Sequence, residues 1–226
     1  MKRACRPSKG FSVVELLVVV AIIAVLASIV VPAVAAAREL ARVAKVHAEL
    51  KIIGNALEAY AMELKTYPPV RVSCNPDMRG HEYQLPVELA DTGYLPKGTG
   101  LQRMVAVEDA FQPGCTYKYN APGDLISNNS PIRNGNYLWV PDQFPTDPIC
   151  GDLFDVTDGK RYNLRRESPV LWVLWSVGRK PDSDKVRSPR APVSRRCWYM
   201  GSRDEGVICH IMRGSGGISA GLIHSP

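Results

Sequence analysis

The clearest pattern in the chain is an uninterrupted apolar block near its start. Residues 16–37 contain one polar side chain, Ser28, and no charged one. At about 1.5 Å of rise per residue, a helix of this length spans about 33 Å, which is enough to cross a hydrocarbon core of about 30 Å. The block therefore predicts a single membrane-spanning helix.

Beyond the block the pattern becomes amphipathic. One apolar stripe recurs at spacings of three and four, at Val43, Val46, Leu50, Ile53, Leu57, Tyr60 and Leu64. Charged residues occupy the other faces, and Pro68 ends the pattern, so the predicted helix runs from about Ser12 to about Lys65. The stripe fits a coiled-coil seam or the packing face of a small sheet. The sheet is favoured, because the stripe is short and Gly54 suits close packing.

The remainder of the chain is punctuated by Pro, Gly, Asn and Asp and contains short β-rich runs. Residues 83–94 could hold a short helix, and the run at 170–177 is apolar on both faces, as expected for a central strand. The other candidate strands are 116–120, 136–140, 195–200, 207–212 and 218–223. The expected fold class is α+β: a long N-terminal helix, half transmembrane and half amphipathic, packed on a small antiparallel β-sheet head.

Composition and charge narrow the class of protein. With 46% hydrophobic and 22% charged residues, the 226-residue chain is neither collagen-like nor a strongly charged disordered protein. Its formal net charge is +6, but removing the first ten residues, which hold four basic side chains, leaves +2. This basic flank is typical of the cytoplasmic end of a membrane segment. The basic stretch 185–196 is not interleaved with aromatic residues, and no nucleic-acid partner is expected.

One carboxylate, Glu15, stands at the start of the apolar block, where a charge is unfavourable in a membrane. Glu15 is the last residue of a specific sequence frame. In this frame Gly10 follows a basic residue, the aromatic Phe11 comes next, and Glu15 lies four residues after Phe11. A secretory signal peptide has no use for this carboxylate, although small residues allow cleavage after Ala35 or Ala37. A plain membrane anchor does not need it either.

The frame around Gly10 and Phe11 resembles the processing site of prepilins and of the pseudopilins of type II secretion systems. The resemblance implies that a prepilin peptidase cleaves between these two residues and methylates the new amine of Phe11. That amine and Glu15 are opposite charges in an apolar setting, where charges persist when they are paired. Pairing between neighbouring subunits would set the axial register of a filament. Pro32 adds to the resemblance, because these proteins usually carry a helix-kinking proline at about this depth.

The resemblance also implies a division of the chain: a leader peptide at 1–10, a transmembrane and assembly helix at 11–37, an amphipathic continuation at 38–67, and a periplasmic globular head at 68–226. The implied function is that of a structural subunit of a type II secretion pseudopilus, not an enzyme. It would span the bacterial inner membrane once, with its head in the periplasm. Its partners would be other copies of itself, prepilin peptidase, other pseudopilins and the inner-membrane assembly platform.

Two alternatives to the pseudopilus stay open. The first is a subunit of a type IV pilus that serves adhesion, motility or DNA uptake. The second is a secreted binding protein released by signal peptidase.

The head carries one candidate metal site. Residues 175–182 resemble the Ser-x-Gly-Pro-Asp-Gly loop of major pseudopilins, which often leads into a calcium site. The resemblance makes Asp182 and Asp184 the candidate calcium ligands, because hard cations take carboxylate oxygens. Three basic neighbours favour a plain solvated turn instead, namely Arg179, Lys180 and Lys185. No other cofactor is expected.

Five cysteines remain after removal of the leader, and an oxidising compartment makes disulfides plausible. Cys197 and Cys209 lie on neighbouring candidate strands and form the first candidate pair. Cys115 with Cys150 is a second candidate, and an odd count leaves one thiol unpaired.

Overall fold

The computed structural model describes residues 12–72, 83–98, 105–141, 159–178, 208–214, 216 and 218–220. The chain divides into two compact units, Met1–Ala41 and Arg42–Pro226. Helix α1 contributes residues to both of them.

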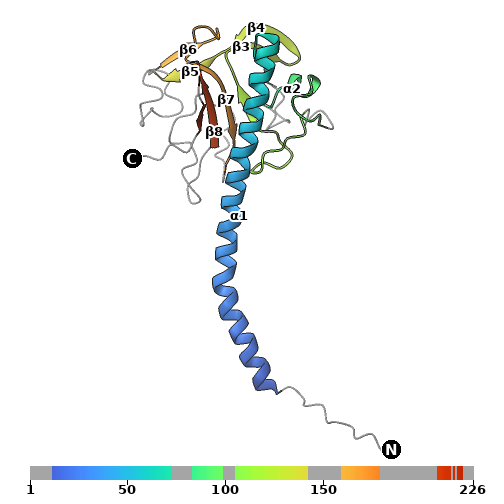
Figure 1. Cartoon of the computed structure of the whole chain (residues 1–226), viewed down its shortest axis with the longest axis vertical. Coiled ribbons are helices and arrows are strands. Elements are labelled where there is room, and N and C mark those ends of the chain that lie inside the picture. Colours follow the sequence, from blue (N-terminus) through green and yellow to red (C-terminus); the bar gives the residue numbers. More distant parts are fainter. Residues whose placement is uncertain are drawn as a thin grey trace, which may run out of the picture. The chain divides into compact units, whose positions relative to one another are not determined.

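Helix α1 spans Val13–Leu64 as one continuous element of 52 residues (Figure 1), which confirms the predicted long helix. In the first unit its large apolar side chains are exposed, from Val13 at 74% to Val34 at 42%. The helix is long and apolar enough to cross a membrane. It ends where Lys65 takes a positive φ of 61° and its Nζ donates to the carbonyl oxygen of Met62, 2.9 Å away. An amine at this end also suits the negative pole of the helix.

Among its described residues, the second unit contains one further helix and three small sheets. Figure 1 labels helix α2 and most of the strands. Helix α2 spans Glu88–Asp91, within the predicted segment. The first sheet has the order β1-β3-β4, with strands Val70–Val72, Gly123–Ser127 and Ser130–Asn136. The central sheet has the order β2-β7-β8-β9, with strands Lys118–Asn120, Val170–Ser176, Ile208–Arg213 and Ile218–Ala220. The third sheet pairs β5, Leu138–Pro141, with β6, Gly159–Tyr162.

The first sheet differs from the sequence-based expectation. The head was expected to be antiparallel, but β1 pairs with β3 in parallel. The β3–β4 hairpin was not predicted, although its turn has a readable signal. Asn128 and Asn129 have φ angles of 48° and 61°, as a two-residue type I′ turn requires, and asparagine tolerates this region better than most residues. The expected strand 136–140 is divided, since Asn136 ends β4 and β5 starts at Leu138. The expected strand 195–200 lies outside the described residues.

The central sheet is covered on both faces, which confirms β7 as a central strand. On one face, Trp172, Leu174 and Ile208 pack in a core with the buried stripe of α1. On the other face, alternate residues of β7 and β8 pack against the β5–β6 sheet, in a core formed by Val173, Trp175, Cys209, Ile211, Leu138 and Val140. The amphipathic stripe is therefore the packing face of a sheet and not a coiled-coil seam. The exception is Leu64, which is 45% exposed at the helix end.

Polar contacts fasten the end of α1 to the head. Glu58 Oε1 accepts hydrogen bonds from Tyr67 Oη at 2.8 Å and from Trp172 Nε1 at 2.7 Å. The Arg165 guanidinium lies over the Tyr67 ring, 4.1 Å from its centre. Burial raises the pKa of the Tyr67 hydroxyl, and the hydrogen bond to Glu58 adds to the shift. The carboxylate thus joins the helix to β7 and to the segment that follows the helix.

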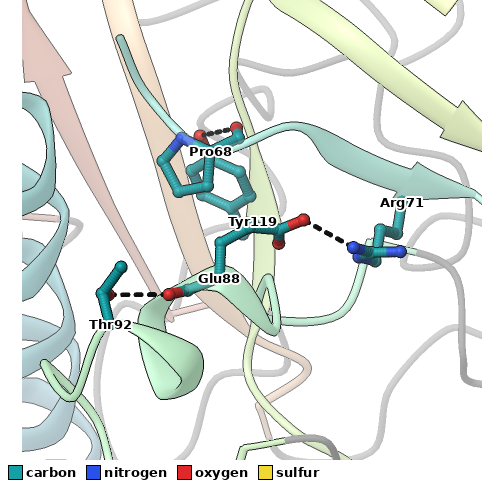
Figure 2. A network of polar contacts seen from close by, with 5 residues as sticks. All are labelled: Pro68, Arg71, Glu88, Thr92 and Tyr119. Atoms are coloured by element: carbon teal, nitrogen blue, oxygen red, sulfur yellow. Dashed lines mark hydrogen bonds and ion pairs between the residues drawn. The ribbon is translucent and has the colours of Figure 1, made fainter. Parts of the chain in front are cut away.

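A second network fastens α2 beside that segment. Figure 2 shows Arg71 Nη2 paired with Glu88 Oε1 at 2.5 Å, and Thr92 Oγ1 donating to the backbone oxygen of Glu88 at 2.7 Å. In the same view Tyr119 Oη donates to the backbone oxygen of Pro68, 2.9 Å away. These contacts connect α2, β1 and β2 to the chain just after the long helix.

The close approach of α1 to the sheet at Gly54 gives a test of the packing. A Cβ added to Gly54 would lie 2.9 Å from Cη2 of the buried Trp172 ring. Alanine ordinarily stabilises a helix over glycine by about 1 kcal/mol, but overpacking a core costs about 1–3 kcal/mol. We expect Gly54→Ala to lower the free energy of unfolding by about 1 kcal/mol in denaturation of the detergent-solubilised chain.

The control is Asn55→Ala at the exposed neighbouring position, where the better helix former should stabilise by a few tenths of a kcal/mol. A Gly54→Ala protein more stable than the wild type would show that the Trp172 ring moves aside without cost.

Candidate functional site at the start of helix α1

The first turn of α1 is closed by two reciprocal hydrogen bonds. Ser12 precedes the first helical residue, and its backbone oxygen accepts the first helical hydrogen bond from Leu16 N at 3.1 Å. Ser12 Oγ accepts from Val14 N at 3.3 Å. In return, Glu15 Oε2 accepts from the backbone N–H of Ser12 at 2.9 Å. This reciprocal pair is a capping box, the arrangement that an S-x-x-E sequence forms at a helix N-terminus.

The capping box gives Glu15 a structural role besides its charge. The first backbone N–H groups of a helix have no partner within the helix, and this end carries a partial positive charge. A carboxylate three residues into the helix therefore supplies an acceptor and a favourable charge together. The prediction above considered Glu15 only as a counter-charge. The spacing of Ser12 and Glu15 ahead of an apolar run is the sequence signal that identifies the cap.

The cap uses only one of the two carboxylate oxygens of Glu15. In the part of the chain that the structure describes, Ser12 is the only residue that bonds to this side chain, and it does so through Oε2. The residues around it, Val13, Val14 and Leu16, are 74%, 67% and 56% exposed. An exposed apolar surface therefore surrounds a carboxylate that can still accept a cation from outside the subunit.

Pro32 lies inside α1, which continues for another 32 residues to Leu64. Because proline has no N–H, the carbonyl oxygen of Ser28, four residues earlier, loses its usual helical donor. The Ser28 hydroxyl does not replace that donor, because it donates to a different carbonyl oxygen, that of Val25, at 2.6 Å. This stretch of the helix therefore has a local weakness in its backbone hydrogen bonding.

Several other predicted site residues are outside the described part of the chain, namely Gly10, Phe11, Asp182, Asp184, Cys150 and Cys197. Cys209 is buried in β8, between β7 and β9, and Cys115 is half-buried. Processing, the calcium site and both disulfide pairs stay predictions. Among the described residues, no group of three or more His, Cys, Asp or Glu side chains is placed to hold a metal ion.

A buried aspartate organises the segment between α2 and β2. Asp109 is 1% exposed, and its carboxylate accepts from Ser176 Oγ at 2.7 Å and from the backbone N–H groups of Phe111 and Val177 at 2.9 and 3.0 Å. Burial raises the pKa of this carboxyl, while the three donors and the charge of Lys118 oppose the shift. With its oxygens bonded to the end of β7, Asp109 has the contacts of a structural residue and not of an open reactive group.

The class of protein follows from the helix and the head together. An exposed apolar helix that continues into the core of a small α+β head is the pilin-like fold. Residues 5–31 match the prokaryotic N-terminal methylation motif, the processing signal of type IV pilin-like prepilins. The matched segment includes Gly10, Phe11 and Glu15, and the motif indicates a structural subunit and not an enzyme. No curated protein and no solved structure matches the chain.

The capping box predicts different effects of two substitutions at Glu15. Glu15→Ala removes the acceptor for the Ser12 N–H, and loss of a cap costs about 1 kcal/mol of local helix stability. Glu15→Gln retains an acceptor oxygen, because glutamine serves in a capping box as glutamate does. In amide hydrogen exchange of the full chain in detergent micelles, Glu15→Ala should lower the protection of Ser12 about fivefold, while Glu15→Gln should resemble the wild type. An equal loss of Ser12 protection in both variants would show that the cap depends on the charge of Glu15 and not on its acceptor oxygen alone.

Proposed function

We propose that this protein is a structural subunit of a type II secretion pseudopilus. It is cleaved after Gly10 by prepilin peptidase, methylated at Phe11 and polymerised through helix α1. The observation that carries the proposal is the methylation motif at residues 5–31, which leads directly into a 52-residue helix. The motif supplies the processing, the exposed apolar residues supply the assembly surface, and the head of the same chain remains in the periplasm.

Assembly takes place through the exposed apolar surface of the first unit. Side chains such as Leu17, Ile23 and Ile29 are 64%, 59% and 66% exposed, so this helix is stable only in lipid or against other helices. Moving from lipid to a bundle of identical helices exchanges one apolar environment for another. Close packing and polar pairing must then favour the filament. Glu15, with an oxygen that the cap does not use, accepts the methylated amine of the neighbouring subunit.

The same features support the proposed location and partners. The basic residues ahead of α1 favour a cytoplasmic N-terminus and a single pass through the inner membrane. Other pseudopilins and the inner-membrane assembly platform would receive the processed subunit. The second candidate, a type IV pilus subunit, shares the same motif and differs in location. A pseudopilus stays in the periplasm, whereas a surface pilus is recovered by shearing cells.

A secreted protein released by signal peptidase receives less support from the structure. The small-residue sites after Ala35 and Ala37 lie within α1, where the peptide bonds are held in the hydrogen-bonded helix. Cleavage there would also separate the head from the membrane segment.

Mass spectrometry of the mature protein tests the processing step. We expect an N-terminal peptide that begins at Phe11 and carries one additional methyl group. Deletion of the host's prepilin peptidase should leave the chain starting at residue 1. A mature N-terminus at Ala36 or Arg38 would show that the chain is released by signal peptidase, and the filament proposal would be abandoned.

Variants at Glu15 test whether the charge or the cap controls assembly. Glu15→Gln keeps the cap and removes the charge, Glu15→Ala removes both, and Ser12→Ala weakens the cap and keeps the charge. Breaking a buried ion pair costs about 3–5 kcal/mol, so both Glu15 variants should be processed normally but should not form filaments detectable by microscopy. Ser12→Ala should assemble. If Glu15→Gln forms filaments like the wild type, pairing with the neighbouring amine does not set the register.

A further inference from the structure

Two histidines from distant parts of the sequence meet where α1 packs on the central sheet. His47 lies on α1 between the buried residues Val46 and Leu50. His210 lies on β8 and is 6% exposed. His210 is two residues after Ile208 and so lies on the same face of the strand, and Ile208 packs in the core on the helix side. The His47 Nδ1 and His210 Nε2 atoms are 3.1 Å apart. The pair therefore connects the helix to the sheet at a partly buried position.

The two rings meet end-on. Their centres are 5.4 Å apart and their planes differ by 30°. The distance between the ring centres is 2.3 Å longer than the distance between the two nitrogens. This difference is about twice the radius of an imidazole ring, so both nitrogens lie close to the line that joins the centres. This is the geometry of an N–H···N hydrogen bond. A metal ion on that line would be about 1.6 Å from each nitrogen, closer than the 2.0–2.1 Å of a zinc–histidine bond.

The hydrogen bond requires that at least one ring is neutral. In the neutral pair one ring donates and the other accepts, and one N–H or lone pair is left over on each ring. These outer atoms, His47 Nε2 and His210 Nδ1, are buried and have no hydrogen-bond partner in the described part of the chain. One added proton places a positive charge in this buried site. A second proton gives both inner nitrogens an N–H and abolishes the bond.

Among the described residues near the pair, no carboxylate is free of other partners to act as its counter-charge. Within one turn of His47, α1 carries three charged residues, Lys45, Glu49 and Lys51. The carboxylate of Glu49 is held by Lys45 at 3.7 Å and by the Tyr117 hydroxyl at 2.5 Å. On the sheet, β7 and β9 carry no charged residue, while β8 carries Arg213 and β2 carries Lys118. Neither ring bonds to a carboxylate among the described residues.

We propose that His47 and His210 form an acid-sensitive latch, which holds α1 to strand β8 while the rings are neutral and loosens when they are protonated. Burial lowers the pKa of both rings, and for His210 burial together with the charge of His47 lowers it to about 4. The unfolded chain binds these protons near pH 6.5, so between pH 6.5 and 4 it holds more protons than the folded chain. The latch therefore contributes fully above pH 6.5, and its contribution decreases as the pH falls.

Unfolding of the full-length chain in detergent micelles tests the latch. Between pH 7.5 and pH 5.0, a pKa of about 4 for His210 lowers the ratio of folded to unfolded protein roughly 30-fold. His210→Gln retains a group that can bond to His47 but does not titrate, so it should lack most of this decrease. His81→Gln is the matched control that removes a histidine outside the pair, and it should follow the wild type. Wild-type and His210→Gln profiles that agree within threefold would overturn the proposal.

Nuclear magnetic resonance of the wild-type chain decides the question even if His210→Gln does not fold. The ring nitrogens of His47 and His210 should titrate below pH 6.5 in two coupled steps. The methyl signals of Leu50 and Ile208, on the two packed elements, should shift with the same midpoint. Rings that titrate near pH 6.5, or methyl signals that do not change as the rings titrate, would each show that the pair is not a latch.

Discussion

The packing of α1 against one face of the central sheet is the contact on which the second unit depends. In the part of the chain that the structure describes, this sheet has four strands of three to seven residues, and its two inner strands are β7 and β8. Trp172 and Leu174 of β7 face the helix. A two-layer core needs an apolar stripe to cover the sheet, and the stripe from Val43 to Tyr60 supplies it. Gly54 is the position where the helix comes close enough for the Trp172 ring to lie against its backbone.

Helix α1 is one element in two environments. Its N-terminal part exposes apolar side chains on every face, as a helix in lipid does, while its C-terminal part has a buried stripe and a polar face. Apart from the Ser28 carbonyl that Pro32 leaves without its helical donor, a continuous helix forms its backbone hydrogen bonds within itself in both environments, which no single strand or loop could do.

Carboxylates at three places perform distinct structural tasks. Glu15 closes the start of α1, Glu58 bonds the end of the same helix to Tyr67 and Trp172, and Asp109 holds the segment before β2 to the end of β7. Each accepts hydrogen bonds from defined donors of the same chain. The His47–His210 pair differs, because each ring keeps one buried nitrogen without a partner among the described residues.

Local patterns in the sequence determined the long helix, its apolar and amphipathic halves, the central strand β7 and the methylation motif. Each depends on residues close together in the chain, through the period of a helix or the spacing around Glu15. The Ser12–Glu15 cap and the Asn128–Asn129 turn were equally local and could have been predicted. Only the tertiary structure decided the parallel pairing of β1 with β3, the approach of Trp172 to Gly54 and the meeting of His47 with His210. These contacts join residues that are 50 or more positions apart, and their partners are selected by the packing of the whole core, which no local pattern contains.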